Sequence, residues 1–192
     1  MGAAMMEWKG ICKAYGEKQV LQNVDLALPE GEVTALMGAS GRGKTTLLRI
    51  VMGLERADSG DVPEMKTVRI SAVFQEDRLL ERLTAEGNLC FVATHAEQIE
   101  EIPQLLRELG LGDETGAAAT FSGGMKRRLA IARALLADYD LLVLDEPFRG
   151  LDETTKRQTM EAVRRRSAGK TVLLVTHDED EARAFAKKII RI

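Results

Sequence analysis

The stretch most suited to chemistry is a glycine-rich loop that ends in a lysine and a threonine, at residues 38–45. It fits the pattern G-x-x-x-x-G-K-[ST] in full, which is typical of a phosphate-binding P-loop. Glycines permit backbone conformations closed to other residues, so successive N–H groups can point at phosphate oxygens. The candidate nucleotide-binding residues of this loop are Gly38, Ala39, Ser40, Gly41, Arg42, Gly43, Lys44 and Thr45.

The residues that close this loop have distinct predicted partners. Lys44 is placed to neutralise the β- and γ-phosphates of a nucleotide, and the Thr45 hydroxyl to bind Mg²⁺. Thr46 could donate a hydrogen bond to the α-phosphate. The alternative is an ordinary glycine-rich turn, which would match this pattern by chance in roughly one chain in a hundred of this length. A strand predicted at Val33–Met37 and a helix predicted from Thr46 to Met52 make that alternative weaker.

Two adjacent carboxylates, Asp145 and Glu146, follow the apolar run Leu141–Leu144. Such a strand delivers them to the edge of the sheet where ligands of open α/β sheets bind. We expect Asp145 to hold Mg²⁺ and Glu146 to polarise the attacking water, since a positioned general base contributes roughly 10²–10⁴-fold. Acidic residues often end strands, so this motif is weak alone and strong after a P-loop.

Two further segments could contact phosphate. Ser122-Gly123-Gly124 opens a predicted helix that runs through Leu136, and its free N–H groups and serine hydroxyl form a second anion site. The alternative is an ordinary N-capped helix with a glycine-rich lead. His177 follows the apolar run Thr171–Val175, which places it at the same edge of the sheet. A lone histidine there is more often structural, but the Asp145-Glu146 pair favours a role at the γ-phosphate.

The elements that position these residues alternate between short apolar runs and amphipathic helical segments, which predicts an α/β core with a mostly parallel sheet. Another strand is predicted at Val68–Phe74. The opening segment, Met6 to Glu32, predicts an antiparallel β layer. The helical period that ends at Leu109 predicts a small helical insert. We expect one domain over residues 1–192, with the core and β layer at about 1–75 and 138–192 and the helical subdomain at about 76–137.

Composition excludes several classes of function. The net charge of −3 argues against broad electrostatic binding to nucleic acid. No stretch approaches the roughly 18 apolar residues that span a bilayer, so a membrane function needs another chain. Cys12 and Cys90 lack metal-ligand spacing and are expected to be buried in a reduced, intracellular protein. The basic runs Lys126–Arg128 and Arg164–Arg166 are predicted to be solvated helix faces.

The motifs together carry a family resemblance. Phe121-Ser122-Gly123-Gly124-Met125 resembles the signature motif of ATP-binding cassette (ABC) ATPases. Gln75, His177 and Gly150-Leu151-Asp152 fall in the order of that family's Q-loop, switch histidine and D-loop, and Tyr15 matches its adenine-stacking aromatic. A packing role in the β layer is the alternative for Tyr15. Met125, Phe121 and Arg149 depart from the commonest family residues without removing a motif, and the segment between Lys44 and Gln75 is short.

This resemblance implies a P-loop NTPase core that hydrolyses ATP with Mg²⁺. It implies catalytic roles for Glu146, His177 and Gln75, and a metal site made by Thr45, Gln75 and Asp145. It also implies a homodimer, or paired ATPase subunits, that sandwiches two ATP molecules, because Ser122 of one subunit caps the γ-phosphate held by Lys44 of the other.

The function implied is the ATP-binding and ATP-hydrolysing subunit of an ABC transporter, whose dimer closure and opening drive solute transport by separate transmembrane permease subunits. Such a subunit is cytoplasmic, lies at the inner face of the cell membrane through its permease, and has a solute-binding protein as a further partner and no nucleic acid. The segment Val73–Leu80 is similar to ATPases of nitrate, sulfonate and taurine importers.

Two other functions compete with this one. A soluble non-transporter ABC ATPase could act on nucleic acid or a protein complex, but the long heptad arms of chromosome-maintenance members and a second cassette are absent from this sequence. A P-loop kinase of small molecules would leave Ser122-Gly123-Gly124 and His177 without a purpose.

Overall fold

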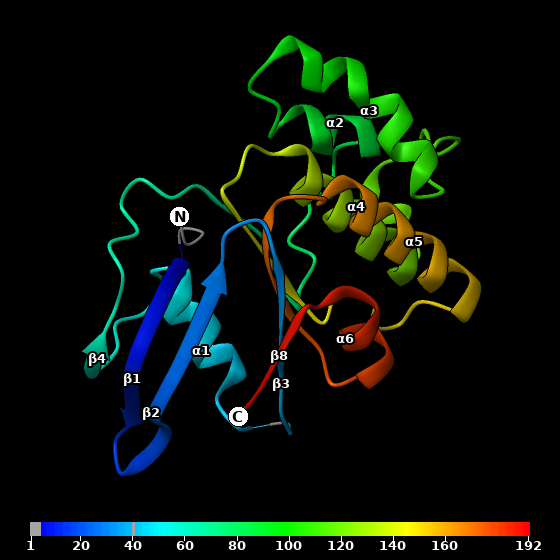
Figure 1. Cartoon of the computed structure of the whole chain (residues 1–192). Coiled ribbons are helices and arrows are strands. Elements are labelled where there is room, and N and C mark those ends of the chain that lie inside the picture. Colours follow the sequence, from blue (N-terminus) through cyan, green and yellow to red (C-terminus); the bar gives the residue numbers. More distant parts are fainter. Residues whose placement is uncertain (1–4, 40) are drawn as a thin grey trace. The chain divides into compact units, whose positions relative to one another are not determined.

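The computed structural model describes residues 5–39 and 41–192. The chain forms two compact units (Figure 1). The first comprises residues 1–70, 140–144 and 169–192, and the second comprises residues 71–139 and 145–168. Organisation as one domain with a helical insert at about 76–137 stays a prediction.

The first unit contains the antiparallel layer predicted at the start of the chain. Strands β1 (Met5–Tyr15) and β2 (Lys18–Pro29) pair antiparallel, with Tyr15 opposite Lys18 across a tight turn. A third strand, β4 (Ser59–Asp61), pairs with the other side of β1. The layer contributes a set of fully buried apolar side chains: Trp8, Ile11, Leu21, Leu26 and Leu28. This alternation of buried and exposed residues is what packs the layer against a core.

A second sheet has five strands, in the order β5-β6-β7-β3-β8. Strand β3 (Val33–Met37) lies between β7 (Thr171–Val175) and β8 (Lys188–Arg191) and is parallel to both. Strands β5 and β6 span Ile70–Val73 and Leu141–Asp145. Every residue of β6 and β7 is buried, as expected for strands covered on both faces. The predicted α/β class with a mostly parallel sheet and an N-terminal β layer is confirmed.

Two helices complete the first unit. Helix α1 (Lys44–Val51) buries Leu47, Leu48, Ile50 and Val51. Helix α6 (Glu179–Phe185) packs Ala182 against Ala35 and Met37 of β3. The structure gives β5 only four residues, where the sequence predicts a strand from Val68 to Phe74.

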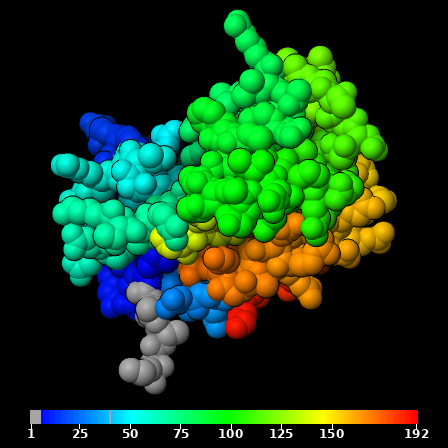
Figure 2. All heavy atoms as spheres, turned by 90° about the horizontal axis from the view of Figure 1, so that it is seen from above, coloured from blue at the N-terminus to red at the C-terminus, as the bar shows by residue number. Residues whose placement is uncertain are grey.

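The second unit is mainly helical. It contains α2 (Ala85–Cys90), α3 (Ala96–Glu108), the short 3-10 helix η1 (Ala118–Thr120), α4 (Gly123–Leu136) and α5 (Glu153–Arg166). In the space-filling view, the green segment that includes α2 and α3 forms a continuous packed surface (Figure 2). The helix predicted to end at Leu109 ends at Glu108, with Leu109 as its C-cap, and Gly110 follows with a φ of +64°.

Ion pairs join α3 to α5 within this unit. Arg166 donates to both carboxylate oxygens of Glu108, at 2.9 and 3.0 Å, and Arg165 lies 3.2 Å from the same carboxylate. These hydrogen bonds, led by Arg166, lower the pKa of Glu108 from its usual value of 4.5 to about 2. The prediction that Arg164–Arg166 is a solvated face is therefore wrong for Arg166, whose guanidinium pairs with the Glu108 carboxylate of α3.

The cysteines differ from expectation. Cys12 is partly buried, and its Sγ accepts a hydrogen bond from the Asn23 N–H at 3.3 Å. Cys90 is exposed because it ends α2, beside the exposed Phe91. The prediction of two buried cysteines is thus wrong for Cys90. Among the described residues, no helix is both long and apolar enough to cross a membrane.

Candidate functional site

The P-loop connects β3 to α1 in the first unit. Ser40, one of its predicted phosphate-binding residues, lies outside the described residues. Gly43 adopts the left-handed conformation, with a φ of +89°, and is the N-cap of α1. A Cβ at this position would lie 2.7 Å from Leu21 Cδ2 and 2.8 Å from the Val20 carbonyl oxygen. Glycine at position 43 is therefore required both by its backbone conformation and by the approach of β2.

The start of α1 is suited to an anion. The first helical hydrogen bond runs from the Leu47 N–H to the Gly43 carbonyl at 2.8 Å, so the N–H groups of Lys44, Thr45 and Thr46 precede it. The first turn carries no acidic residue. The Lys44 ammonium donates to the carbonyl oxygens of Gly38, at 2.6 Å, and Ala39, at 3.0 Å. A cation, the helix dipole and backbone donors thus converge on one loop.

His177 leaves the sheet at the same edge as the P-loop. Leu36 of β3 pairs with Val175 of β7, and the Thr176 N–H donates to the Leu36 carbonyl at 3.3 Å. Gly38 lies two residues after Leu36, and His177 lies two residues after Val175. The turn is held by the Thr176 hydroxyl, which is 2.5 Å from the Glu181 carboxylate, and the His177 side chain is exposed. The structure therefore brings these two predicted groups to neighbouring strand ends.

Tyr15 ends β1, and its side chain is 46% exposed. Its hydroxyl donates to Glu55 Oε1 at 2.5 Å, and the Lys13 ammonium lies 5.6 Å from the ring centroid. The hydrogen bond of the hydroxyl restrains the ring, while its exposure leaves ring surface accessible. This is a suitable arrangement for stacking on a planar base.

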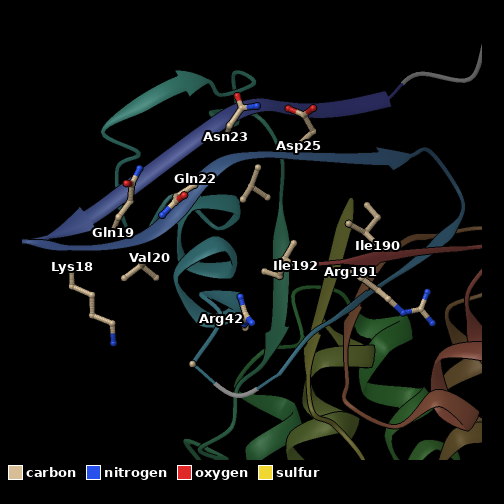
Figure 3. Close-up of a pocket in the computed structure, with 12 residues that line it drawn as sticks. Lys18, Gln19, Val20, Gln22, Asn23, Asp25, Arg42, Ile190, Arg191 and Ile192 are labelled. Carbon is tan, nitrogen blue, oxygen red and sulfur yellow. The ribbon is translucent and has the colours of Figure 1, made fainter.

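A pocket that the sequence did not indicate lies beside the P-loop in the first unit (Figure 3). Its volume is about 520 Å³, within the range of small-molecule sites. It is lined by β2 residues between Lys18 and Asp25, by Gly41 and Arg42, and by residues 190–192. Sequence reasoning treated β2 only as part of a structural layer, and no motif marked its polar face.

A second pocket, of about 330 Å³, brings together four predicted site residues in the other unit: Gln75, Gly123, Gly124 and Glu146. Asp77, Arg127, Arg149 and Gly150 complete its lining. Three segments far apart in the sequence therefore meet here: the loop after β5, the start of α4 and the loop after β6. Gln75 is exposed, so its amide is accessible.

The start of α4 has the features expected of an anion site. Ser122 is its N-cap, and the Ser122 Oγ accepts a hydrogen bond from the Met125 N–H at 3.3 Å. Ser122 and Gly123 are both exposed, and the space where a Gly123 Cβ would stand is open. The hydroxyl can still donate outward while its oxygen caps the helix.

The two carboxylates after β6 differ in environment. Asp145 is the last residue of β6 and is only 6% exposed. Glu146 follows with a φ of +47°, one of three positive φ values at non-glycine residues in the described part of the chain. Such a conformation costs of order 1–3 kcal/mol and persists only where the surroundings impose it. Arg149 Nη1 lies 3.9 Å from Glu146 Oε2.

The basic run on α4 is not the solvated face that the sequence predicts. Arg127 is 5% exposed and donates to the carbonyl oxygens of Phe74, Asp145, Glu146 and Pro147. Arg128 donates to the carbonyls of Leu109 and Gly110, at 2.6 and 2.8 Å, and closes the end of α3. A guanidinium carries five donors and can be buried where backbone carbonyls need partners, which a charge pattern does not reveal.

Comparison with known proteins decides the family. The sequence profile described as "ABC transporter" matches residues 21–149. The chain belongs to the ABC transporter family. It is 42% identical over 190 residues to an aliphatic sulfonates import ATP-binding protein of Rhodococcus jostii (strain RHA1), covering 94% of this chain and 68% of the relative. It is 41% identical to the protein of that name from Corynebacterium glutamicum, covering 95% of this chain and 77% of the relative.

Solved structures give the same result for this ABC ATPase. The structure of an ATP-binding subunit of an ABC transporter superposes with a TM-score of 0.88 at 28% identity, covering 98% of this chain and 86% of the other. A dimeric structure of a bacterial ABC transporter cassette superposes with a TM-score of 0.83 at 31% identity, covering 98% and 94%. The predicted family, fold class and ATPase activity are confirmed: this ABC chain binds and hydrolyses ATP as a transporter subunit.

The residues predicted to hold Mg²⁺ fit that cation by their chemistry. Thr45, Gln75 and Asp145 offer hydroxyl, amide and carboxylate oxygens, and Mg²⁺ prefers oxygen ligands. The described residues contain no group of three histidine, cysteine or acidic residues able to hold a metal alone. Mg²⁺ does not need one, because it is usually bound by one or two carboxylates together with substrate phosphates and water.

Proposed function

We propose that this ABC ATPase is the energy-coupling subunit of an importer for aliphatic sulfonates or a closely related class of small anions. The observation that carries the proposal is the presence of two helix starts suited to phosphate in one chain, at Lys44 of α1 and Ser122 of α4, together with relatives named for sulfonate import. A single nucleotide has no evident use for two such cradles. Two chains arranged head to tail use both.

The division of labour in that pair follows from the chemistry of each group. Lys44 and the first N–H groups of α1 bind the β- and γ-phosphates of ATP, and Ser122 of the second copy donates to the same γ-phosphate. Tyr15 stacks on adenine. The P-loop and the signature helix thereby form one complete site from two copies, and each pair contains two such sites.

Hydrolysis in this proposal depends mainly on position and charge. Thr45, Gln75 and Asp145 would hold Mg²⁺, which would supply neutralisation of phosphate charge. Glu146 accepts a proton from the attacking water, and His177 donates a hydrogen bond to the γ-phosphate and orients that water. Gln75 senses whether the γ-phosphate is present, because it begins the loop that leads from β5 to the helices of its unit.

The partners proposed are two transmembrane permease subunits and a solute-binding protein. The relatives are import proteins by name, and an importer ATPase needs a membrane channel that another chain supplies. The subunit would then be held at the cytoplasmic face of the cell membrane through the permease.

Growth on sulfur sources tests this proposal directly. A strain without this chain should grow normally on sulfate and fail on an alkanesulfonate as sole sulfur source. The wild-type chain should restore growth on the alkanesulfonate, and Glu146→Gln, expressed to the same level, should not. Unimpaired growth of the deletion strain on a panel of alkanesulfonates would contradict the proposed solute class. Restoration by Glu146→Gln would contradict the need for hydrolysis through Glu146.

A further inference from the structure

The Arg127 guanidinium lies at the junction of the three segments that line the second pocket. It belongs to α4, the helix that Ser122 caps. Its Nη2 atom donates to the carbonyl oxygens of Asp145, at 2.7 Å, and Glu146, at 2.6 Å, and its Nε donates to Pro147 at 3.1 Å. Its Nη1 donates to the Phe74 carbonyl, directly before Gln75, and lies 3.2 Å from Asp77 Oδ1.

These contacts act on the backbone that carries the reacting groups. Glu146 is held at a φ of +47°, a strained conformation, and the carbonyls of Asp145, Glu146 and Pro147 all accept from the same guanidinium. Each acceptor is a strong hydrogen-bonding group that is costly to leave unpaired when buried. Arg127 therefore supplies interactions that fix the direction in which the Glu146 side chain leaves the chain.

The loop that begins with Gln75 is fixed by the same residue and by its neighbours. Arg133, two turns along α4 from Arg127, donates to the Asp77 carbonyl at 3.3 Å. The Arg78 guanidinium lies 4.0 Å from the centroid of the Phe74 ring. Of these three arginines, Arg127 is the one whose hydrogen bonds reach both the Gln75 loop and the Glu146 segment.

We propose that Arg127 is a positioning residue for ATP hydrolysis, whose planar guanidinium holds the Gln75 loop and the Glu146 segment in one arrangement and ties both to the signature helix. This inference rests on the proposed roles of Glu146 and Gln75. Arg127 itself touches no substrate; it acts through the backbone. If Arg127 holds these segments in this way, a displacement of α4 moves Gln75 and Glu146 with it.

The shape of the guanidinium makes the proposal testable. A lysine at position 127 keeps the charge but has one tetrahedral head group, which cannot bond four carbonyls and a carboxylate spread around a plane. In Arg127→Lys, kcat should fall roughly 10–100-fold, because misplacement of a reacting group by about 1 Å can cost 10²-fold. ATP affinity, measured by fluorescent-nucleotide titration, should stay within about threefold since no phosphate ligand is removed.

Arg128→Lys is the matched control. Arg128 is the next residue of the same helix and donates to two carbonyls at the end of α3 rather than to the pocket. It should keep kcat within about threefold, even if its melting temperature falls as far as that of Arg127→Lys. An equal fall of kcat in both variants would overturn the positioning role and indicate general loss of the folded state.

Rescue separates positioning from folding. Arg127→Ala removes the guanidinium and leaves space for the free ion, so guanidinium chloride at a few millimolar, far below denaturing concentrations, should raise kcat several-fold. The same addition should leave Arg128→Ala unchanged. If Arg127→Lys is too unstable to assay, this rescue decides the question, and absence of rescue in a folded Arg127→Ala protein overturns the proposal.

A double-mutant cycle distinguishes this inference from the proposed function. Glu146→Gln alone should nearly abolish turnover; retention of turnover would remove Glu146 from the base role and leave the Arg127 result to be judged separately. In the Glu146→Gln background, Arg127→Lys should change the residual rate by less than about twofold, because the two residues act as one unit. A further fall as large as in the wild-type background would show that Arg127 does not act through Glu146.

Discussion

Single residues of this ABC ATPase show how chain geometry, rather than side-chain chemistry alone, selects an amino acid. Gly43 has a positive φ, and its Cα faces both Val20 and Leu21 of β2. The pattern G-x-x-x-x-G-K-[ST] names this glycine but does not say why it is needed. The structure gives two reasons, backbone conformation and a close approach from another strand, and their effects can be separated.

Gly43→Ala should lose both stability and ATP binding. The left-handed conformation costs an alanine about 1–2 kcal/mol, and its Cβ would meet β2 at 2.7 and 2.8 Å, so the loop must shift. We expect ATP affinity by calorimetry to fall at least tenfold. Gly53→Ala is the control, because Gly53 has a φ of +68° and open space around its Cβ. It should lose stability and keep its ATP affinity; equal affinity losses would show that strain alone explains the effect.

At the scale of elements, the regular parts were predictable and the polar contacts between them were not. The β3 and β7 bounds follow from continuous apolar runs, and the α4 start follows from Ser122 with two glycines. For helix α5, only the end at Arg164–Arg166 was predicted as helical, because the helix is mostly polar and buries only Thr159, Ala162 and Val163. The burial of Arg127 was missed because its partners are carbonyl groups, which every residue has.

Several candidate site residues could be placed from the sequence, although their roles stay predictions. Residues that follow a strand or open a helix carry motifs with fixed spacing, so the P-loop and the groups of the second pocket could be named. The pocket beside β2 could not, since it depends on how residues 190–192 pass beside the P-loop. Three-dimensional proximity of segments without a motif has no signal in one sequence.

The ion pairs between α3 and α5 give the helical unit a predictable response to pH. Glu108 has a folded pKa of about 2 against a usual value of 4.5, so its contribution to stability is fully present above pH 4.5 and is lost as pH falls toward 2. Glu108→Gln should cost about 1 kcal/mol at neutral pH after allowance for solvent screening, a fall of roughly 2–4 °C in melting temperature. Circular dichroism at pH 7, 5, 4 and 3 measures it.

The difference between wild type and Glu108→Gln should shrink below pH 4.5, because the unfolded wild-type chain then binds a proton at Glu108 that the folded protein, with its pKa of about 2, does not bind. Glu100→Gln, which alters an exposed carboxylate of α3, should change the melting temperature by less than about 1 °C at every pH. A deficit in Glu108→Gln that persists unchanged at pH 3 would show that packing of the side chain, and not its charge, joins the helices.

At the scale of the whole molecule, the decisive expectation is that one chain is half of each ATP site. Lys44 and Ser122 lie in different compact units, and each begins a helix suited to phosphate. In a head-to-tail pair, the Lys44 of one copy and the Ser122 of the other share one nucleotide. Lys44→Ala and Ser122→Arg should therefore each abolish turnover, the first by loss of ATP affinity and the second with affinity retained.

Mixing these two inactive variants should restore hydrolysis. A mixed dimer has one site with both changes and one intact site, built from the Lys44 of the Ser122→Arg chain and the Ser122 of the Lys44→Ala chain. Random pairing makes half of the dimers mixed, so about a quarter of wild-type turnover is expected if one intact site suffices. Lys44→Ala mixed with the double variant Lys44→Ala/Ser122→Arg has no intact site and should stay inactive. Failure of the first mixture to recover, with subunit exchange verified by differently tagged chains, would mean that each chain uses its own signature helix.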